Sequence, residues 1–279
     1  MERSITLQSE VFQEMNESNE SSNSTIHNVR SSFKFSHSTN TNPQEILVDE
    51  DGDLLLQRKS NIKEVVIEHF NRSPLDLVGM QVWRSALLMS DFIMYRRDIF
   101  NYNQVVLELG SGVGMTGIVL AMHCKETIFT DVNNKDILSN IKKNINLNKD
   151  LIIGHTTVLP LDFKEELFSE LLREKLKDVK IIIAADVVYD NEITKQFINT
   201  VRKLMTITPD KTTYIGLEKR YIFSTTELDI CAPCYDFFIE LLNKASWCKL
   251  ELLDCNFTQY FHYNRVKELV LLKLTVQKP

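Results

Sequence analysis

Short apolar runs alternate with amphipathic stretches from residue 104 to the end of the chain. We expect the apolar runs to form strands at residues 105–109, 127–130, 152–158, 179–184, 213–217, 248–253 and 267–274. The stretches between them carry apolar side chains at helical spacing, as Ile137, Ile141 and Ile145 do. Strands that alternate with helices predict an α/β fold, in which a mostly parallel sheet has helices on both faces.

The first hundred residues lack this alternation. Residues 1–44 are rich in Ser, Asn, Thr and Glu, so we expect a disordered tail. Residues 45–100 are expected to form an extension packed on the main domain, which covers residues 101–279. In this extension an Asp-Gly dipeptide between apolar runs predicts a β-hairpin, followed by a strand near residues 65–67 and an amphipathic helix over 85–95.

The chain carries 32 Lys and Arg against 38 Asp and Glu, a net charge of −6. General nucleic-acid binders have a basic excess, so we expect no strong nucleic-acid binding. Because no apolar run is long enough to cross a membrane and no signal-peptide core is visible, we expect a nuclear or cytoplasmic protein.

The five cysteines are an odd number without a regular spacing, which indicates reduced thiols in an intracellular compartment. Cys231 and Cys234 form a C-x-x-C pair, but no second pair stands at zinc-ligand spacing. We therefore predict no metal site.

A glycine-rich turn follows the first strand of the main domain, in the segment Glu108-Leu-Gly-Ser-Gly-Val-Gly. Gly110, Gly112 and Gly114 have no Cβ, so the backbone N–H groups of this turn can approach a ligand closely. The third glycine of the dinucleotide fingerprint would fall at Met115, which argues against a nucleotide-dependent oxidoreductase.

Ligands of such sheets bind at the carboxyl ends of the strands, so the residues that follow the later strands are candidates for ligand binding. We expect Asp131 to accept hydrogen bonds from ribose hydroxyls, and a second, compatible role would be to cap the next helix. Phe163 either lies against an adenine ring, with Asp162 near the adenine amine, or belongs to the core. Asp186 either faces the reacting centre or caps the following helix.

Trp83 precedes the predicted helix over 85–95, and it either packs against that helix or covers the entrance of a cofactor site. After the fourth strand the chain has Asp186-Val-Val-Tyr189. It lacks the two prolines that adenine N6 methyltransferases carry there, which argues against a nucleobase amine as acceptor.

In this order, these segments resemble methyltransferase family 16, the seven-strand protein-lysine methyltransferases. The resemblance covers about residues 45–275, and the segments 48–53, 218–220 and 235–238 narrow it to one member of the family. It implies a class I, Rossmann-like methyltransferase sheet of seven mostly parallel strands, with a small N-terminal hairpin added.

The resemblance also implies S-adenosylmethionine as the cofactor and the ε-amine of a protein lysine as the acceptor. The residues that would line the cofactor site are Trp83, Gly110, Ser111, Gly112, Asp131, Phe163 and Ala185. Asp186 and Tyr189 would be the catalytic residues beside the acceptor amine. We expect Glu108 to fix the glycine turn or to reach the methionine amine of the cofactor. Many relatives have Trp in place of Phe163, so here the indole donor is lost.

Two other functions stay open: a class I methyltransferase acting on a small molecule or a nucleic acid, and a scaffold that binds S-adenosylmethionine without catalysis. A site that no longer catalyses should have lost some of its functional residues, whereas this chain keeps the glycine turn, Asp131 and the Asp186 to Tyr189 segment. We expect the protein to be a monomer.

Overall fold

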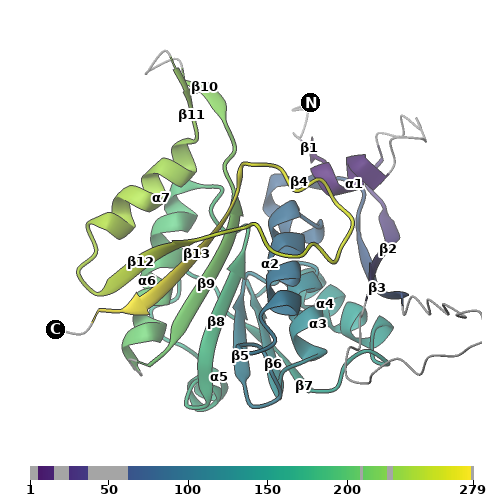
Figure 1. Ribbon diagram of the computed structural model, residues 1–279, viewed down its shortest axis with the longest axis horizontal. Helices are drawn as coiled ribbons and strands as arrows, with labels where there is room; N and C mark the ends of the chain where they lie inside the picture. Colours follow the sequence, from purple (N-terminus) through teal and green to yellow (C-terminus); the bar gives the residue numbers. More distant parts are fainter. Residues whose placement is uncertain (1–5, 16–24, 37–61, 208–209, 225–228, 278–279) are drawn as a thin grey trace, which may run out of the picture.

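The structure, a computed structural model, describes residues 6–15, 25–36, 62–207, 210–224 and 229–277. Its centre is a seven-stranded sheet in the order β12-β13-β9-β8-β5-β6-β7 (Figure 1). These strands are β5 (Val105–Leu109), β6 (Glu126–Asp131), β7 (His155–Pro160), β8 (Val179–Ala185), β9 (Thr212–Glu218), β12 (Cys248–Leu253) and β13 (Leu269–Val276). β13 runs antiparallel to its neighbours β9 and β12, whereas the strands from β9 to β7 pair in parallel. All seven predicted strands and the mostly parallel sheet are confirmed, although β7 begins later than expected.

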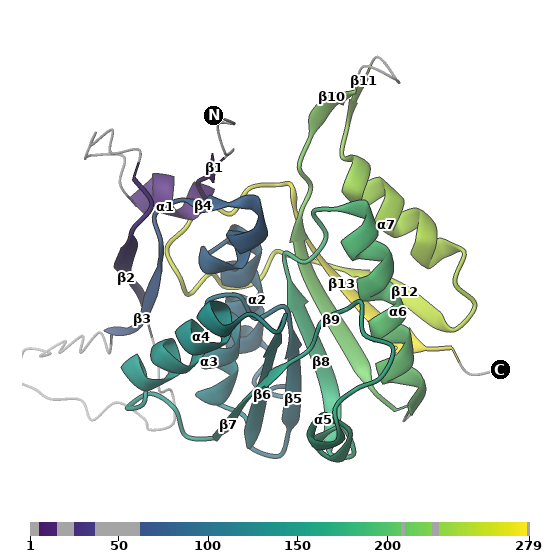
Figure 2. The same ribbon diagram turned by 180° about the vertical axis from the view of Figure 1, so that it is seen from behind.

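Helices cover both faces of this sheet, as Figures 1 and 2 show. One face carries α2 (Arg84–Tyr95), α3 (Met115–Ala121) and α4 (Lys135–Leu147), and the other carries α5 (Glu170–Lys175), α6 (Asn191–Ile207) and α7 (Pro233–Asn243). The side chains of β5 alternate between the faces, so Val106 packs with the first group of helices and Leu107 with the second. A strand buried on both faces needs a continuous apolar run, which is the pattern that predicted it.

Residues of the predicted disordered tail form regular elements. These are β1 (Thr6–Leu7), which pairs with β4 (Ser73–Pro74), α1 (Glu10–Met15), and β2 (Asn28–Ser36), which pairs with β3 (Ile62–Phe70). The tail prediction is wrong for these residues because they do bury apolar side chains. Phe33 and Phe35, on one face of β2, are 4% and 2% exposed, and Val11 of α1 is 2% exposed.

An N-terminal hairpin is thus present, as predicted, and β2 and β3 are its described strands. The strand expected near residues 65–67 lies within β3. The expected Asp-Gly turn and its flanking apolar runs lie outside the described residues.

Asn144 of α4 and Asn148, which follows this helix as its C-cap, attach β3 to the main domain. Asn144 accepts a hydrogen bond from the N–H of Glu68 (2.8 Å) and donates one to its carbonyl oxygen (2.9 Å). Asn148 does the same with Val66, at 2.8 and 2.7 Å. Asn144 also donates to the carbonyl oxygen of Val113 (2.8 Å), in the glycine turn. The same side chain therefore joins the N-terminal hairpin to the turn after β5.

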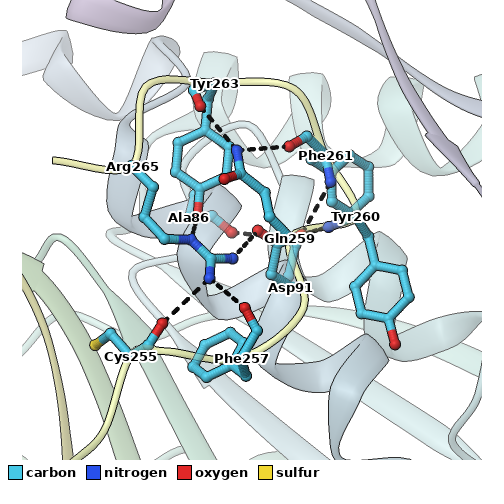
Figure 3. Close-up of polar contacts among 10 residues, drawn as sticks. Ala86, Asp91, Cys255, Phe257, Gln259, Tyr260, Phe261, Tyr263 and Arg265 are labelled. Carbon is cyan, nitrogen blue, oxygen red and sulfur yellow. Dashed lines mark hydrogen bonds and ion pairs between the residues drawn. The ribbon is translucent and has the colours of Figure 1, made fainter.

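A long loop joins β12 to β13, and a buried ion pair fastens it to α2 (Figure 3). Asp91 is fully buried and accepts hydrogen bonds from the N–H groups of Tyr260 (2.8 Å) and Phe261 (2.9 Å). Arg265 donates to the same carboxylate at 2.5 Å and to the carbonyl oxygen of Phe257 at 2.6 Å. The loop between the last two strands is therefore a packed part of the domain.

Two short strands, β10 (Ile222–Ser224) and β11 (Asp229–Cys231), form an antiparallel pair beyond β9. Neither was predicted, because a three-residue strand is too short to show a periodic pattern. Within the part of the chain that the structure describes, no helix combines the length and apolar character needed to span a membrane.

Candidate functional site

A cavity of about 780 Å³ lies where the parallel strands have their carboxyl ends. Every residue that we expected to bind the cofactor or to act in catalysis lines it. These residues are Trp83, Glu108, Gly110, Ser111, Gly112, Asp131, Asp162, Phe163, Ala185, Asp186 and Tyr189. The fold thus brings together side chains from the ends of β5, β6, β7 and β8, while the role of each one stays a prediction.

The glycine turn packs against η1 (Leu75–Met80), a 3-10 helix that precedes α2. Gly110 and Gly112 have φ values of +65° and +54°, a conformation that other residues rarely adopt. A Cβ on Gly112 would lie 2.7 Å from the carbonyl oxygen of Gly79 in η1. This close backbone contact explains the need for glycine here, and the turn and η1 together form one wall of the cavity.

Asp131 ends β6 and holds the glycine turn. Its Oδ2 accepts a hydrogen bond from the N–H of Gly112 (2.7 Å), and its Oδ1 accepts one from the N–H of Val132 (2.8 Å). Burial raises the pKa of the Asp131 carboxyl, although these two N–H groups oppose the rise. The cap of α4 is Asn134, so the second role expected of Asp131, as a helix cap, is wrong. Each carboxylate oxygen has a second lone pair, which leaves Asp131 able to accept from a ligand.

Glu108 is 2% exposed and also lines the cavity. Burial raises the pKa of its carboxyl to about 8, and the charge of Asp131 adds to the rise. Its Oε2 is buried and makes no hydrogen bond of ordinary geometry with the described residues, although the Ser111 side chain and the Gly117 N–H lower the pKa of this carboxyl. Because a buried polar atom without a well-formed hydrogen bond is costly, a ligand that donates a hydrogen bond to this atom would be stabilised here.

Phe163 follows β7 and serves two purposes. Its ring packs against that of Phe197 in α6, with centroids 5.4 Å apart, and it also lines the cavity. Phe163 therefore packs in the core and is also exposed to the cavity, and its contact with an adenine ring stays a prediction. Asp162 stands beside it and accepts a hydrogen bond from the N–H of Lys164 (2.9 Å).

Asp186 follows β8 in a left-handed conformation, with a φ of +58° that is uncommon for a residue other than glycine. Its N–H donates to the carbonyl oxygen of Gly216 in β9 (2.9 Å), which holds this conformation. Asp190 caps α6 by accepting hydrogen bonds from the N–H groups of Glu192 and Ile193, so the alternative of Asp186 as that cap is wrong.

Arg220 is a residue of this cavity that was not predicted. Its Nη1 and Nη2 donate to the two carboxylate oxygens of Asp186, at 2.9 and 2.7 Å. The guanidinium also lies over the ring of Trp83, 5.1 Å from the ring centre, while the indole N–H of Trp83 donates to the carbonyl oxygen of Val78 (3.0 Å). The sequence showed only an arginine just after a strand, and nothing in the pattern linked it to an aspartate 34 positions away.

Tyr189 lies at the rim of the cavity and is 39% exposed. Burial raises the pKa of its hydroxyl to about 12, and the charges of Asp131, Asp190 and Asp186 add to the rise. At neutral pH this side chain is therefore a hydrogen-bond donor.

No group of three His, Cys, Asp or Glu side chains that could hold a metal ion occurs among the described residues. The polar groups that line the cavity are carboxylates, hydroxyls, backbone and side-chain amides, the amine of Lys164 and the guanidinium of Arg220.

Comparisons with known proteins agree with this geometry. A family profile described as lysine methyltransferase matches residues 64–229. Methyltransferase-like protein 22 of Mus musculus is 34% identical over 235 residues, which cover 76% of this chain and 59% of that protein. The Homo sapiens protein of the same name is 32% identical over 256 residues, 83% of this chain and 63% of that protein. Calmodulin-lysine N-methyltransferase of Arabidopsis thaliana is 29% identical over 157 residues, 54% of this chain and 49% of that protein.

The chain spans about three fifths of the length of the two methyltransferase-like 22 proteins. Segments 48–53, 218–220 and 235–238 pointed to this member of the family, and this expectation is confirmed. Since the profile matches more than half of the chain and the mouse relative exceeds 30% identity over three quarters of it, the chain belongs to the lysine methyltransferase family.

Proposed function

We propose that this chain transfers a methyl group from S-adenosylmethionine to the ε-amine of a lysine in a protein substrate. The observation that carries the proposal is one cavity lined by Glu108, Asp131 and Asp186, at the ends of three neighbouring strands. Its volume of about 780 Å³ falls within the usual range of small-molecule sites. Several similar proteins are named as protein-lysine methyltransferases, among them the Arabidopsis relative.

S-adenosylmethionine is the cofactor of this family, and the donors and acceptors of the cavity fit it. Glu108 Oε2, buried without a hydrogen bond of ordinary geometry to the described residues, would accept a hydrogen bond from the α-amine. Asp131 would accept from the ribose hydroxyls, and Phe163 would lie against the adenine ring, with Asp162 near its amine. When bound, the cofactor supplies a methyl group that is activated by its positively charged sulfur.

Both reactants of the proposed reaction carry positive charge, and the cavity is predominantly acidic. The only basic residues among its described lining are Lys164 and Arg220. The acidic ones are Asp76, Glu108, Asp131, Asp162, Asp186 and Asp190. This excess of carboxylates favours a sulfonium and an ammonium over anionic ligands such as nucleic acid.

Asp186 and Tyr189 are proposed to act on the acceptor amine. A lysine amine must lose its proton before it attacks, and its ordinary pKa is about 10.4. Partial burial beside a cation lowers that pKa. Asp186 would orient the amine by accepting a hydrogen bond; because Arg220 binds both of its oxygens, it serves as a fixed acceptor. Most of the rate acceleration would come from positioning the two reactants.

The partner of this site would be a protein that presents a lysine, in the nucleus or the cytoplasm, and the chain would act as a monomer. Reduced thiols are typical of these compartments. Two of the cysteines, Cys124 and Cys248, are buried thiols.

The proposal is tested by incubating the protein with methyl-labelled S-adenosylmethionine and a cell lysate, followed by mass mapping of the labelled sites. We expect the label on lysine side chains. Label on RNA or on metabolites alone would show that the acceptor is wrong, and failure to bind S-adenosylhomocysteine would contradict the cofactor assignment.

An Asp186→Asn variant sharpens this test. We expect the rate of label transfer to fall about 100-fold, because the amine loses a charged acceptor, while the dissociation constant of S-adenosylhomocysteine changes less than about threefold. A variant that keeps the wild-type rate would remove Asp186 from the mechanism.

A further inference from the structure

The ion pair of Arg220 and Asp186 belongs to a larger charged cluster that reaches α1. Glu218, at the end of β9, has a side chain only 10% exposed, and its Oε1 accepts a hydrogen bond from Arg84 of α2 (2.8 Å). Arg84 also donates to Glu14 of α1, at 2.9 and 2.7 Å. Carboxylates from β9, α1 and the end of β8 thus hold the two arginines.

Glu10 stands four residues before Glu14 on α1, so the two carboxylates lie on the same face of this helix. Burial lowers the pKa of Arg220, and the carboxylates of Asp186, Glu10 and Glu218 together outweigh that effect and raise it. In Glu10 and in Glu218 the Oε2 atom is buried and has no hydrogen-bond partner among the described residues. The four carboxylates of Glu10, Glu14, Asp186 and Glu218 therefore outnumber the two guanidinium groups of Arg84 and Arg220, although burial raises the pKa of Glu218.

Gln81 holds the N-terminal segment, residues 6–15, against the wall of the cavity. This side chain is buried; it accepts a hydrogen bond from the N–H of Ser9 (2.6 Å) and donates to the carbonyl oxygen of Leu7 (3.1 Å). Leu7 itself lines the cavity. The family profile matches residues 64–229, so this segment lies outside the matched residues.

We propose that Arg220 is a positioning residue for the acceptor end of the cavity, and that the N-terminal segment contributes to this through α1, whose Glu14 binds Arg84 and whose Glu10 has a buried carboxylate oxygen. Arg220 fixes the Asp186 carboxylate in the left-handed turn after β8, and Trp83 covers the guanidinium. Asp186 is the carboxylate of the cluster that lines the cavity, and there it attracts an incoming ammonium, which is the group that a lysine acceptor brings. This role rests on the proposed function.

Four full-length variants test the inference: Arg220→Met removes the ion pair, Arg220→Lys keeps a cation, Glu10→Gln removes one charge, and Glu174→Gln is the matched control. Glu174 is exposed on α5, away from the cavity, and it pairs with Lys177 there. The probe is label transfer from methyl-labelled S-adenosylmethionine to lysine in a lysate dilution series at saturating cofactor. This series separates the maximal rate from the half-saturating amount of lysate. S-adenosylhomocysteine affinity is measured by calorimetry.

We expect Arg220→Met to lower the maximal rate about 100-fold and Arg220→Lys to restore at least a tenth of the wild-type rate. Glu10→Gln should lower the ratio of maximal rate to half-saturating lysate about fivefold, since one nearby charge is lost. Cofactor affinity should change less than about threefold in each variant. Glu174→Gln should match the wild type.

Rates of Arg220→Met and Glu10→Gln that equal the control would overturn the inference. So would parallel losses of rate and of cofactor affinity, since these would show a general structural role. If Arg220→Met does not fold, Arg220→Lys and Glu10→Gln decide the question. A wild-type protein that transfers no label to lysine would instead contradict the proposed function.

Discussion

At the scale of single residues, the cavity contains carboxyl groups whose surroundings oppose their charge. Burial raises the pKa of Glu108 to about 8 and also raises that of Asp131. Buried groups of this kind cost stability, and they are typical of functional sites, where a ligand supplies the missing partner. Asp186 differs from both because an arginine already holds its two oxygens.

An Asp131→Asn variant should bind S-adenosylhomocysteine about 10- to 100-fold more weakly, because the amide has one acceptor oxygen and must still serve the N–H groups of Gly112 and Val132. Isothermal titration calorimetry measures the affinity, and circular dichroism checks the fold. Asp150→Asn, at an exposed position after α4, is the control. Unchanged affinity in Asp131→Asn would reject the ribose-binding role.

Glu108 should make the stability of the free protein depend on pH. The folded-state pKa is about 8, above the ordinary value of 4.5, so the folded state binds the proton more tightly than the unfolded state. The resulting stability is present at pH 4.5 and below, and it is lost as the pH rises toward 8.

We therefore expect Glu108→Gln to raise the free energy of unfolding by roughly 3 kcal/mol at pH 8 and by much less near pH 4.5. At pH 8 the variant should accordingly unfold at a higher temperature than the wild type. The same variant should bind the cofactor more weakly. Thermal melts at both pH values measure this, and equal stabilisation at both would contradict the assigned titration.

At the scale of elements, side chains and one antiparallel bridge between Phe35 and Phe261 attach the N-terminal hairpin to the main domain. Asn144 of α4 and its C-cap Asn148 bind the backbone of β3 much as a neighbouring strand would. Asn144 reaches the glycine turn as well. The hairpin therefore supports the turn that lines the cavity, although it lies outside the main sheet.

An Asn144→Ala variant should lose about 2–3 kcal/mol of unfolding free energy, because the backbone groups of Glu68 and the carbonyl oxygen of Val113 lose buried partners. Asn146→Ala, at an exposed position on the same helix, should change stability by less than about 0.5 kcal/mol. Urea unfolding measures both values, and similar losses in the two variants would show that the contacts of Asn144 do not matter.

At the scale of the whole molecule, two long-range attachments complete the domain. Asp91 and Arg265, separated by 174 positions, hold the loop after β12 on α2 (Figure 3). Gln81 and Arg84 hold the N-terminal segment on the cavity. Both attachments bury polar groups, and removing one partner of such a pair leaves the other unsatisfied.

We expect Arg265→Met to cost about 3–5 kcal/mol of unfolding free energy, since it leaves the carboxylate of Asp91 buried without its cation. Arg96→Met is the control, because Arg96 pairs with Asp98 at the surface and should contribute less than about 1 kcal/mol. Chemical unfolding measures both variants. A loss in Arg265→Met no larger than in Arg96→Met would show that the buried pair does not hold the loop.

The sequence by itself determined the seven strands, the glycine turn and the carboxylates at the strand ends. These features are local: a buried strand requires a continuous apolar run, and a turn with positive φ requires glycine, as at Gly110 and Gly112. The position of Asp131 and Asp186 at one edge then follows from the parallel topology.

Only the tertiary structure decided that Arg220 binds Asp186, that α1 joins the charged cluster, and that residues 6–15 and 28–36 are ordered. A periodic pattern shows which face of an element is apolar, but not which distant element covers it. Polar partners such as Gln81 and Ser9, 72 positions apart, meet only once the layers have packed. The polar composition of the tail suggested disorder. That prediction was wrong for these residues because a few apolar side chains, Val11, Phe33 and Phe35 among them, suffice to anchor a mainly polar segment on an existing core.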